Sequence, residues 1–346
     1  MPKNTVYVIG AGASYEIDLP VGNQLKDHIA KILNMEFKYN SFKDGNYDLY
    51  QTIRRHTQNN SNETNKYLNE CSHIRKNMPL AISIDNFIDS ERGNDELALC
   101  GKMAIVEAIL EAERNSKIFF AEYKGSKNID FPRLENTWYL PFFRTLTENL
   151  KAEELQERFK TITLIIFNYD RCIEHFLIRS LMSYYRLQEA AAAEILSSLK
   201  IIHPYGTVGS LPWQDNLSST SMEYGGELNH QQHIQYAQRI RTFTEGAHSE
   251  HMSPLRHSMK NTERLVFLGF AFHRLNMELL MGGTHERYKN PMRIECFATA
   301  FETSKNDQDS IKASIQHLYA GEINISIQNT TCAQLFRDNS RSLSYA

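Results

Sequence analysis

TVYVIGAGAS, residues 5–14, is the stretch around which the rest of the chain is arranged. Its first half, residues 5–9, is rich in β-branched and aromatic side chains and predicts a short buried strand. Its second half is a turn of small residues, Gly10, Ala11, Gly12, Ala13 and Ser14. Small residues let backbone N–H groups approach a bulky anion, and a following helix directs its positive end at that anion. The stretch therefore predicts either a dinucleotide phosphate site or a plain tight turn.

The glycine turn departs from the common dinucleotide fingerprint, G-x-G-x-x-G/A, at two points. Tyr15 stands where the third small residue belongs. In addition, no second strand ending in an acidic residue follows about 20 positions later. The turn alone does not decide between the two interpretations.

Composition excludes several classes of protein. The chain has 346 residues, 41% hydrophobic and 23% charged, which is typical of a globular protein with a substantial core. A net charge of −3 gives no global electrostatic reason to expect direct nucleic-acid binding. No apolar run approaches the roughly 20 residues that span a bilayer, so we expect no membrane partner. No H-E-x-x-H or C-x-x-C spacing occurs, so we expect no metal site, no disulfide framework and a cytoplasmic location.

Five later segments also predict strands, because each is short, apolar and β-branched and is bounded by turn residues or a helix: 161–167, 200–203, 264–268, 293–298 and 322–327. Strands that alternate with helices indicate an α/β fold. We expect a Rossmann-like, doubly wound, mostly parallel sheet of about six strands.

A long segment without strand character separates the first strand from the others. Residues 59–65 form a polar tract that predicts an exposed loop, and residues 66–150 show helical spacing of apolar side chains. We therefore predict a helical insertion at 35–159, after the first strand–helix unit. Residues 1–34 and 160–346 would then form the nucleotide-binding domain.

Polar side chains follow two of the predicted strands. Asn168 and Asp170 come directly after residues 161–167, and His203 ends the strand that begins at residue 200. The carboxyl ends of strands in an open α/β sheet line the ligand crevice, so these side chains are candidate site residues. His203 precedes a glycine turn and is a candidate general base. Asp170 has an alternative role as the cap of the next helix, and the loop at 215–229 is either a lid or a surface excursion.

Five segments together resemble the sirtuin-like NAD-hydrolase domain of bacterial anti-phage defence systems: residues 10–14, 19–22, 167–170, 203–207 and 267–272. The resemblance implies an NAD⁺ hydrolase that releases nicotinamide and ADP-ribose, with NAD⁺ as substrate. Asn168 and Asp170 match the family's Q-N-x-D motif, with Phe167 in place of Gln. Together with His203 they would be catalytic. The residues implied to bind the dinucleotide are Gly10, Ala11, Gly12, Ala13, Ser14, Pro20, Gly206, Gly269 and Phe270.

Two departures from the family pattern matter. The family's catalytic His directly precedes a Gly, whereas here Tyr205 precedes Gly206 and His203 lies two positions earlier. Either His203 acts from a shifted register or Tyr205 fills the catalytic position. The four-cysteine zinc module of protein-deacylating sirtuins is missing, which favours hydrolysis of NAD⁺ itself.

The resemblance also implies how such an enzyme is regulated. It predicts a homo-oligomer and a partner such as a hexameric DNA-translocase ATPase of the HerA type. Two other functions stay open at this point. One is a zinc-free deacylase or ADP-ribosyltransferase, and the other is a non-catalytic sensor of NAD⁺ or ADP-ribose.

Overall fold

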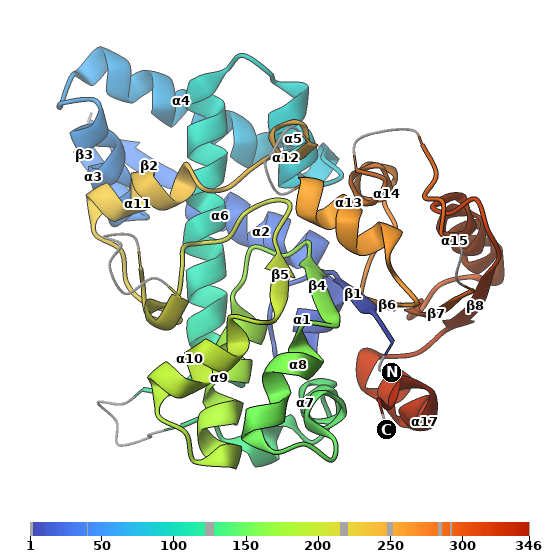
Figure 1. Cartoon of the computed structure of the whole chain (residues 1–346). Helices are drawn as coiled ribbons and strands as arrows, with labels where there is room; N and C mark the ends of the chain where they lie inside the picture. The colour runs from blue at the N-terminus through green and yellow to red at the C-terminus, as the bar shows by residue number, and fades with distance from the viewer. Residues whose placement is uncertain are drawn as a thin grey trace.

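The computed structural model describes residues 3–39, 41–121, 128–214, 221–247, 252–282, 286–290 and 293–345. Its centre is an all-parallel six-stranded sheet with the order β5-β4-β1-β6-β7-β8 and with helices on both faces (Figure 1). The strands are β1 (Thr5–Ile9), β4 (Ile162–Ile166), β5 (Lys200–Ile202), β6 (Arg264–Leu268), β7 (Ile294–Thr299) and β8 (Ile323–Gln328). The α/β class and all six predicted strands are confirmed. In chain order this is the 3-2-1-4-5-6 arrangement of nucleotide-binding sheets.

Strand β1 lies in the middle of the sheet, and its side chains are buried on both faces. Val6 and Val8 belong to the core on one face, and Tyr7 and Ile9 to the core on the other. Ile9 pairs in register with Ile166 of β4 and with Leu268 of β6. The three central strands therefore end level with one another, so the turns that follow them start at the same edge of the sheet.

Each face of the sheet is covered by its own set of helices. The core that begins on the Val6 face includes side chains of α2 (Gly22–Ile32), α3 (Tyr47–His56), α4 (Ser61–Asn77), α5 (Ile84–Ser90), α6 (Asp95–Asn115), α11 (His230–Ala237), α12 (Phe243–Ala247), α13 (Met252–Lys260), α14 (Arg274–Leu280) and α15 (Lys305–His317). The Tyr7 face packs against α1 (Ala11–Tyr15), α7 (Tyr139–Thr147), α8 (Leu155–Phe159), α9 (Cys172–Tyr185), α10 (Glu189–Leu196), α16 (Cys332–Asp338) and α17 (Ser340–Leu343). None of the helices formed by the described residues combines the length and apolar character needed to cross a membrane.

The insertion at 35–159 differs from the prediction in two places. It contains an antiparallel hairpin, β2 (Met35–Lys38) and β3 (Ser41–Gly45), which lies with α3 far from the sheet (Figure 1). The predicted loop at 59–65 is wrong from residue 61 onward, because α4 begins there. The side chain of Asn60 caps this helix by accepting hydrogen bonds from the N–H groups of Asn62 and Glu63.

The helices of the insertion share both cores of the sheet. Residues 97–110 of α6 belong largely to the same core as Val6 and Val8. Trp138 and Phe142, from the end of the insertion, belong to the core that contains Tyr7. The indole N–H of Trp138 also donates to the carbonyl of Ala13, at 2.8 Å. The insertion therefore packs directly against the strand and turn that open the chain.

Candidate functional site

The turns after β1 and β6 meet where the strand order reverses, the position at which open α/β sheets bind ligands. The N–H groups of Gly10 and Gly12 donate to the carbonyls of Leu268 and Gly269, each at 3.0 Å. A Cβ on Gly10 would lie 2.6 Å from the Gly269 oxygen, and Gly269 itself has a φ of +54°. Glycine is therefore required here so that two backbone segments can touch. The plain-turn interpretation accounts for these glycines, since these two amides already have backbone acceptors.

Phe270 continues this contact into the core. A Cβ on Gly10 would lie 2.8 Å from its Cα, and its buried ring packs against Phe167 at 5.0 Å and Phe267 at 5.6 Å between centroids. Phe270 therefore supports the glycine turn from the Val6 face of the sheet.

A buried hydrogen-bonded relay joins the turn after β1 to the turn after β4. The Asn168 amide donates from Nδ2 to Ser14 Oγ at 3.0 Å, and Ser14 Oγ donates to Asp170 Oδ2, also at 3.0 Å. All three side chains are buried. Asp170 Oδ1 also accepts from the N–H of Cys172 at 3.1 Å, so Asp170 supports the start of α9 as well. Ser14 thus holds the amide and the carboxylate at one edge of the sheet.

His203 joins the same group from the end of β5. Its Nδ1 lies 3.1 Å from the backbone oxygen of Asn168, and its Nε2 lies 2.7 Å from Oε1 of Glu174 on α9. Both partners are acceptors when Glu174 is ionised, so both ring nitrogens then carry hydrogen and the imidazole is cationic. Accepting a proton from a ligand would require His203 to lose one proton and to open one of these two bonds.

Burial and charge act against each other on the ionisable groups of the relay. Burial lowers the pKa of His203, but the adjacent Glu174 carboxylate outweighs this and raises the pKa above its usual value. Burial raises the pKa of Asp170, although hydrogen bonds from Cys172 and Ser14 act in the opposite direction. This environment therefore favours the protonated, cationic form of His203. The Asp170 carboxyl, by contrast, is ionised less easily than in water.

Several predicted site residues lie outside the relay. Tyr205 is buried in the core on the opposite face from Ser14, and its hydroxyl donates to Oδ1 of Asn276 at 2.5 Å. Gly206 closes the turn after β5 by donating to the carbonyl of His203 at 3.1 Å. Ala11 is exposed and Pro20 is half-buried in the segment between β1 and α2, and the hydrogen bonds of the relay join Ser14, Asn168 and Asp170 instead. The structure therefore brings His203, and not Tyr205, beside Asn168.

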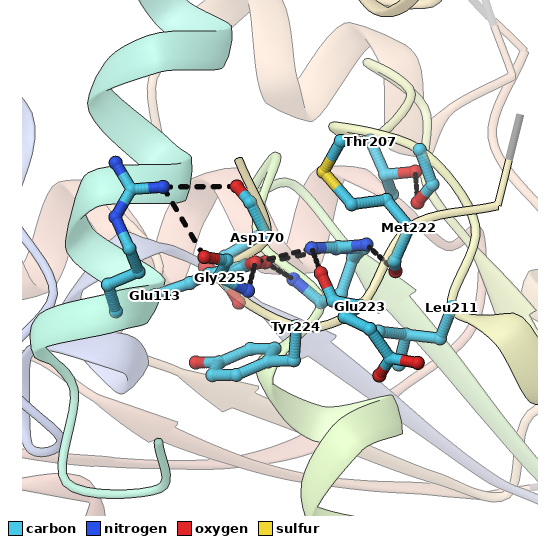
Figure 2. A network of polar contacts seen from close by, with 12 residues as sticks. Glu113, Asp170, Thr207, Leu211, Met222, Glu223, Tyr224 and Gly225 are labelled. Carbon is cyan, nitrogen blue, oxygen red and sulfur yellow. Dashed lines mark hydrogen bonds and ion pairs between the residues drawn. The ribbon is translucent and has the colours of Figure 1, made fainter. Parts of the chain in front are cut away.

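A buried ion pair fixes the far side of the Asn168–Asp170 turn. Arg171 Nη2 lies 2.5 Å from Oε2 of Glu113 at the end of α6, and both side chains are at most 1% exposed. Arg171 also donates to the carbonyls of Met222 and Glu223, at 2.8 and 3.1 Å. Glu113 accepts from the Gly225 N–H at 2.9 Å, so one carboxylate ties the turn to the loop that carries Met222–Gly225 (Figure 2).

The same loop is anchored by an aromatic contact. Tyr224 stacks on His175 of α9 with ring centroids 4.1 Å apart and planes 9° apart. Its hydroxyl lies 3.0 Å from both Ser116 Oγ and Cys172 Sγ. Of the predicted loop at 215–229, residues 215–220 lie outside the described residues, while the part from 221 to 226 is fastened against α9 and the end of α6.

No protein-family model and no curated protein sequence matches the chain. Across the described part of the chain, no group of three or more His, Cys, Asp or Glu side chains is placed to hold a metal ion. The site that the structure does present is the relay of Ser14, Asn168, Asp170 and His203.

Three acidic partners of this site were missed by the sequence analysis. Glu174 holds His203, Glu113 holds Arg171, and Asp85 of α5 accepts a hydrogen bond from the Tyr169 hydroxyl. Glu174 gave a usable signal, because it is a charged residue within the apolar first turns of a helix that follows a candidate site. Asp85 and Glu113 belong to the insertion, where nothing in the local sequence relates them to the turn.

Proposed function

We propose that this chain cleaves the bond between nicotinamide and ribose in NAD⁺. The observation that supports this best is the relay, in which Ser14 holds Asn168 and Asp170 together and His203 bonds to the carbonyl of Asn168. The relay contains an amide, a carboxylate and an imidazole, and it lies at the edge of the sheet where open α/β folds commonly bind ligands. These groups suit a reaction at a sugar carbon.

The chemistry of NAD⁺ makes limited demands on such a site. Nicotinamide leaves NAD⁺ as a neutral molecule, so its departure needs no general acid. The site has to stabilise an oxocarbenium-like ribosyl centre, as in glycoside cleavage. The Asp170 carboxylate would stabilise that positive charge, and the Asn168 amide would position the incoming water. His203, once neutral, would accept a proton from the water or from a ribose hydroxyl.

The direct test is to incubate the purified chain with NAD⁺ and to separate the products by chromatography. We expect nicotinamide and ADP-ribose in equal amounts. Removing a positioned base costs about 10²–10⁴-fold, so Asn168→Ala and His203→Ala should slow the release of nicotinamide by that factor. Matched controls are Asn261→Ala and His257→Ala, at exposed positions at the end of α13, which should keep the parent rate.

The same experiment separates the competing functions. Transfer of ADP-ribose or of an acyl group, measured with an acylated peptide present, would indicate a transferase or a deacylase. Binding of NAD⁺ without turnover would indicate a sensor. Hydrolysis at the parent rate by both Asn168→Ala and His203→Ala would overturn the assignment of the site. Thermal unfolding of each variant shows whether a loss of rate comes from a loss of fold.

We also propose that the activity is controlled by assembly, because uncontrolled NAD⁺ cleavage is toxic to the cell that makes the enzyme. The expected assemblies are a homo-oligomer and a complex with a HerA-type hexameric ATPase. Light scattering of the chain, alone and mixed with such an ATPase, measures both. A chain that stays monomeric and does not bind the ATPase would contradict this part of the proposal.

A further inference from the structure

The turn after β4 has a second set of side chains that the proposed reaction does not use. Asn168 and Asp170 bond to Ser14, while Tyr169 and Arg171 alternate with them and bond elsewhere. The Tyr169 hydroxyl donates to Oδ1 of Asp85, and Arg171 pairs with Glu113. Both carboxylates belong to the insertion, one on α5 and one on α6. Every second residue of the turn is thus attached to the insertion.

The two attachments differ in strength. Arg171 and Glu113 are fully buried and share several hydrogen bonds with the loop at 222–225, so this pair is part of the packed interior. Asp85 is half-buried and holds Tyr169 through one hydrogen bond. Burial raises the pKa of Asp85 to about 6, although the bond from Tyr169 acts in the opposite direction. The attachment through Asp85 is therefore the weaker of the two.

Tyr169 is also tied to the segment that carries His203. Its backbone carbonyl accepts a hydrogen bond from the N–H of Val208 at 3.1 Å, in the loop that follows β5. Its ring lies 6.2 Å from the ring of Tyr205 in the same loop. A movement of the Tyr169 side chain would therefore disturb both the Asn168–Asp170 turn and the loop beside His203.

We propose that Asp85 is a positioning residue: by holding the Tyr169 hydroxyl, it fixes the orientation of the Asn168 amide and the Asp170 carboxylate. This inference rests on the proposed cleavage of NAD⁺, and it adds that α5 of the insertion controls the geometry of the reacting edge. A misplacement of about 1 Å costs on the order of 100-fold in rate, so one hydrogen bond at this position is sufficient to matter.

The test compares Asp85→Ala, which removes the acceptor of the Tyr169 hydroxyl, with Tyr169→Phe and the double variant in the full chain. We expect each single change to lower kcat for NAD⁺ by about 10- to 100-fold, with KM changed less than about threefold, because substrate contacts stay in place. The double variant should lose no more than either single variant, since both remove the same bond. Asp89→Ala, one turn further along α5, and Tyr319→Phe, whose hydroxyl bonds to the carbonyl of Met259, are matched controls that should keep kcat.

A second measurement is independent of catalysis. Hydrogen–deuterium exchange of the peptide that contains residues 167–173 should rise in Asp85→Ala and Tyr169→Phe and stay unchanged in both controls. If the parent chain does not cleave NAD⁺, the proposed function fails, and the exchange experiment still decides whether Asp85 restrains the turn. Unchanged exchange, an unchanged kcat, or losses that multiply in the double variant would each overturn the inference.

Discussion

At the scale of single residues, the most consequential contact is the one between Glu174 and His203. The 2.7 Å bond between Oε1 and Nε2 is partly buried, the Glu174 side chain is itself buried, and Oε2 of Glu174 has no hydrogen-bond partner among the described residues. A buried carboxylate with one engaged oxygen is costly unless its partner is charged. The pair therefore favours the imidazolium form of His203. The same preference raises the pH at which His203 becomes neutral, the form that a general base requires.

This contact predicts a pH-dependent stability. Because the pKa of His203 is raised by Glu174, the pair contributes its full stabilisation below the ordinary value of 6.5 and loses it as the pH rises through the folded-state pKa. Glu174→Gln removes the ionic part of the pair. We expect this variant to be less stable than the parent by about 1.5–3 kcal/mol at pH 6, with a smaller difference at pH 9. Urea unfolding at both pH values measures this, and a difference that grows with pH would contradict it.

The same pair predicts how the proposed activity depends on pH. The kcat of the parent should rise with pH as His203 loses its extra proton, because only the neutral ring accepts a proton. In Glu174→Gln the midpoint of that rise should move to lower pH, since the carboxylate that raises the pKa of His203 is gone. A pH–rate profile of both proteins measures the shift. Identical midpoints would show that His203 does not control the rate.

At the scale of elements, the sequence predicts the strands well and their surroundings less well. Each sheet strand is a short run of apolar, β-branched residues bounded by turn residues, which is local information. The hairpin at 35–45 escaped prediction because its side chains are largely exposed and show no apolar run. Helix α4 was predicted to start too late, because its first turn is polar. Its buried apolar side chains, Cys71 and Ile74, come later in the helix.

The candidate site was predictable to the extent that topology alone determines it. Parallel strands end at one edge, so Ser14, Asn168, Asp170 and His203 could be expected to meet there, and they do. The acidic partners could not be expected, because their positions depend on how the helices pack. The sequence places Gly10 and Gly12 only in the turn after the first strand. It does not show why glycine is needed there, because the backbone of Gly269, which leaves no room for a Cβ, is distant in the sequence.

Helix α6 carries a prediction of its own, since its end holds both the Asp170 turn and the loop at 222–225. Glu113→Ala would leave Arg171 buried without its carboxylate, which typically costs about 3–5 kcal/mol. We expect urea unfolding to show a loss of that size. Replacing both residues with Met should recover part of the loss, because no unpaired charge then remains buried. A loss below about 1 kcal/mol in Glu113→Ala would show that the ion pair does not hold the turn.

At the scale of the whole molecule, the insertion and the sheet share their cores. Side chains of α6 cover the Val6 face, and Trp138 and Phe142 cover Tyr7. Tyr7 and Phe142 are in direct edge-to-face contact, with ring centroids 5.2 Å apart. Large apolar surfaces would therefore lose their cover if the insertion were removed.

This packing predicts the outcome of a deletion. A chain in which residue 34 is joined directly to residue 160 should lose cooperative unfolding and bind a hydrophobic dye, because the central strands are exposed on both faces. Circular dichroism in the near ultraviolet and dye fluorescence measure this. A deletion variant that still unfolds cooperatively would show that the part that carries the six-stranded sheet is a domain in its own right.

The central place of β1 has a consequence for synthesis on the ribosome. This strand is made well before both strands that pair with it, β4 and β6, because they lie much later in the sequence. Gly269, whose carbonyl accepts a hydrogen bond from the glycine turn, follows β6. The edge that carries the candidate site therefore stays incomplete until residue 269 has been translated, and a fragment that ends before this residue would lack the backbone against which the glycine turn packs.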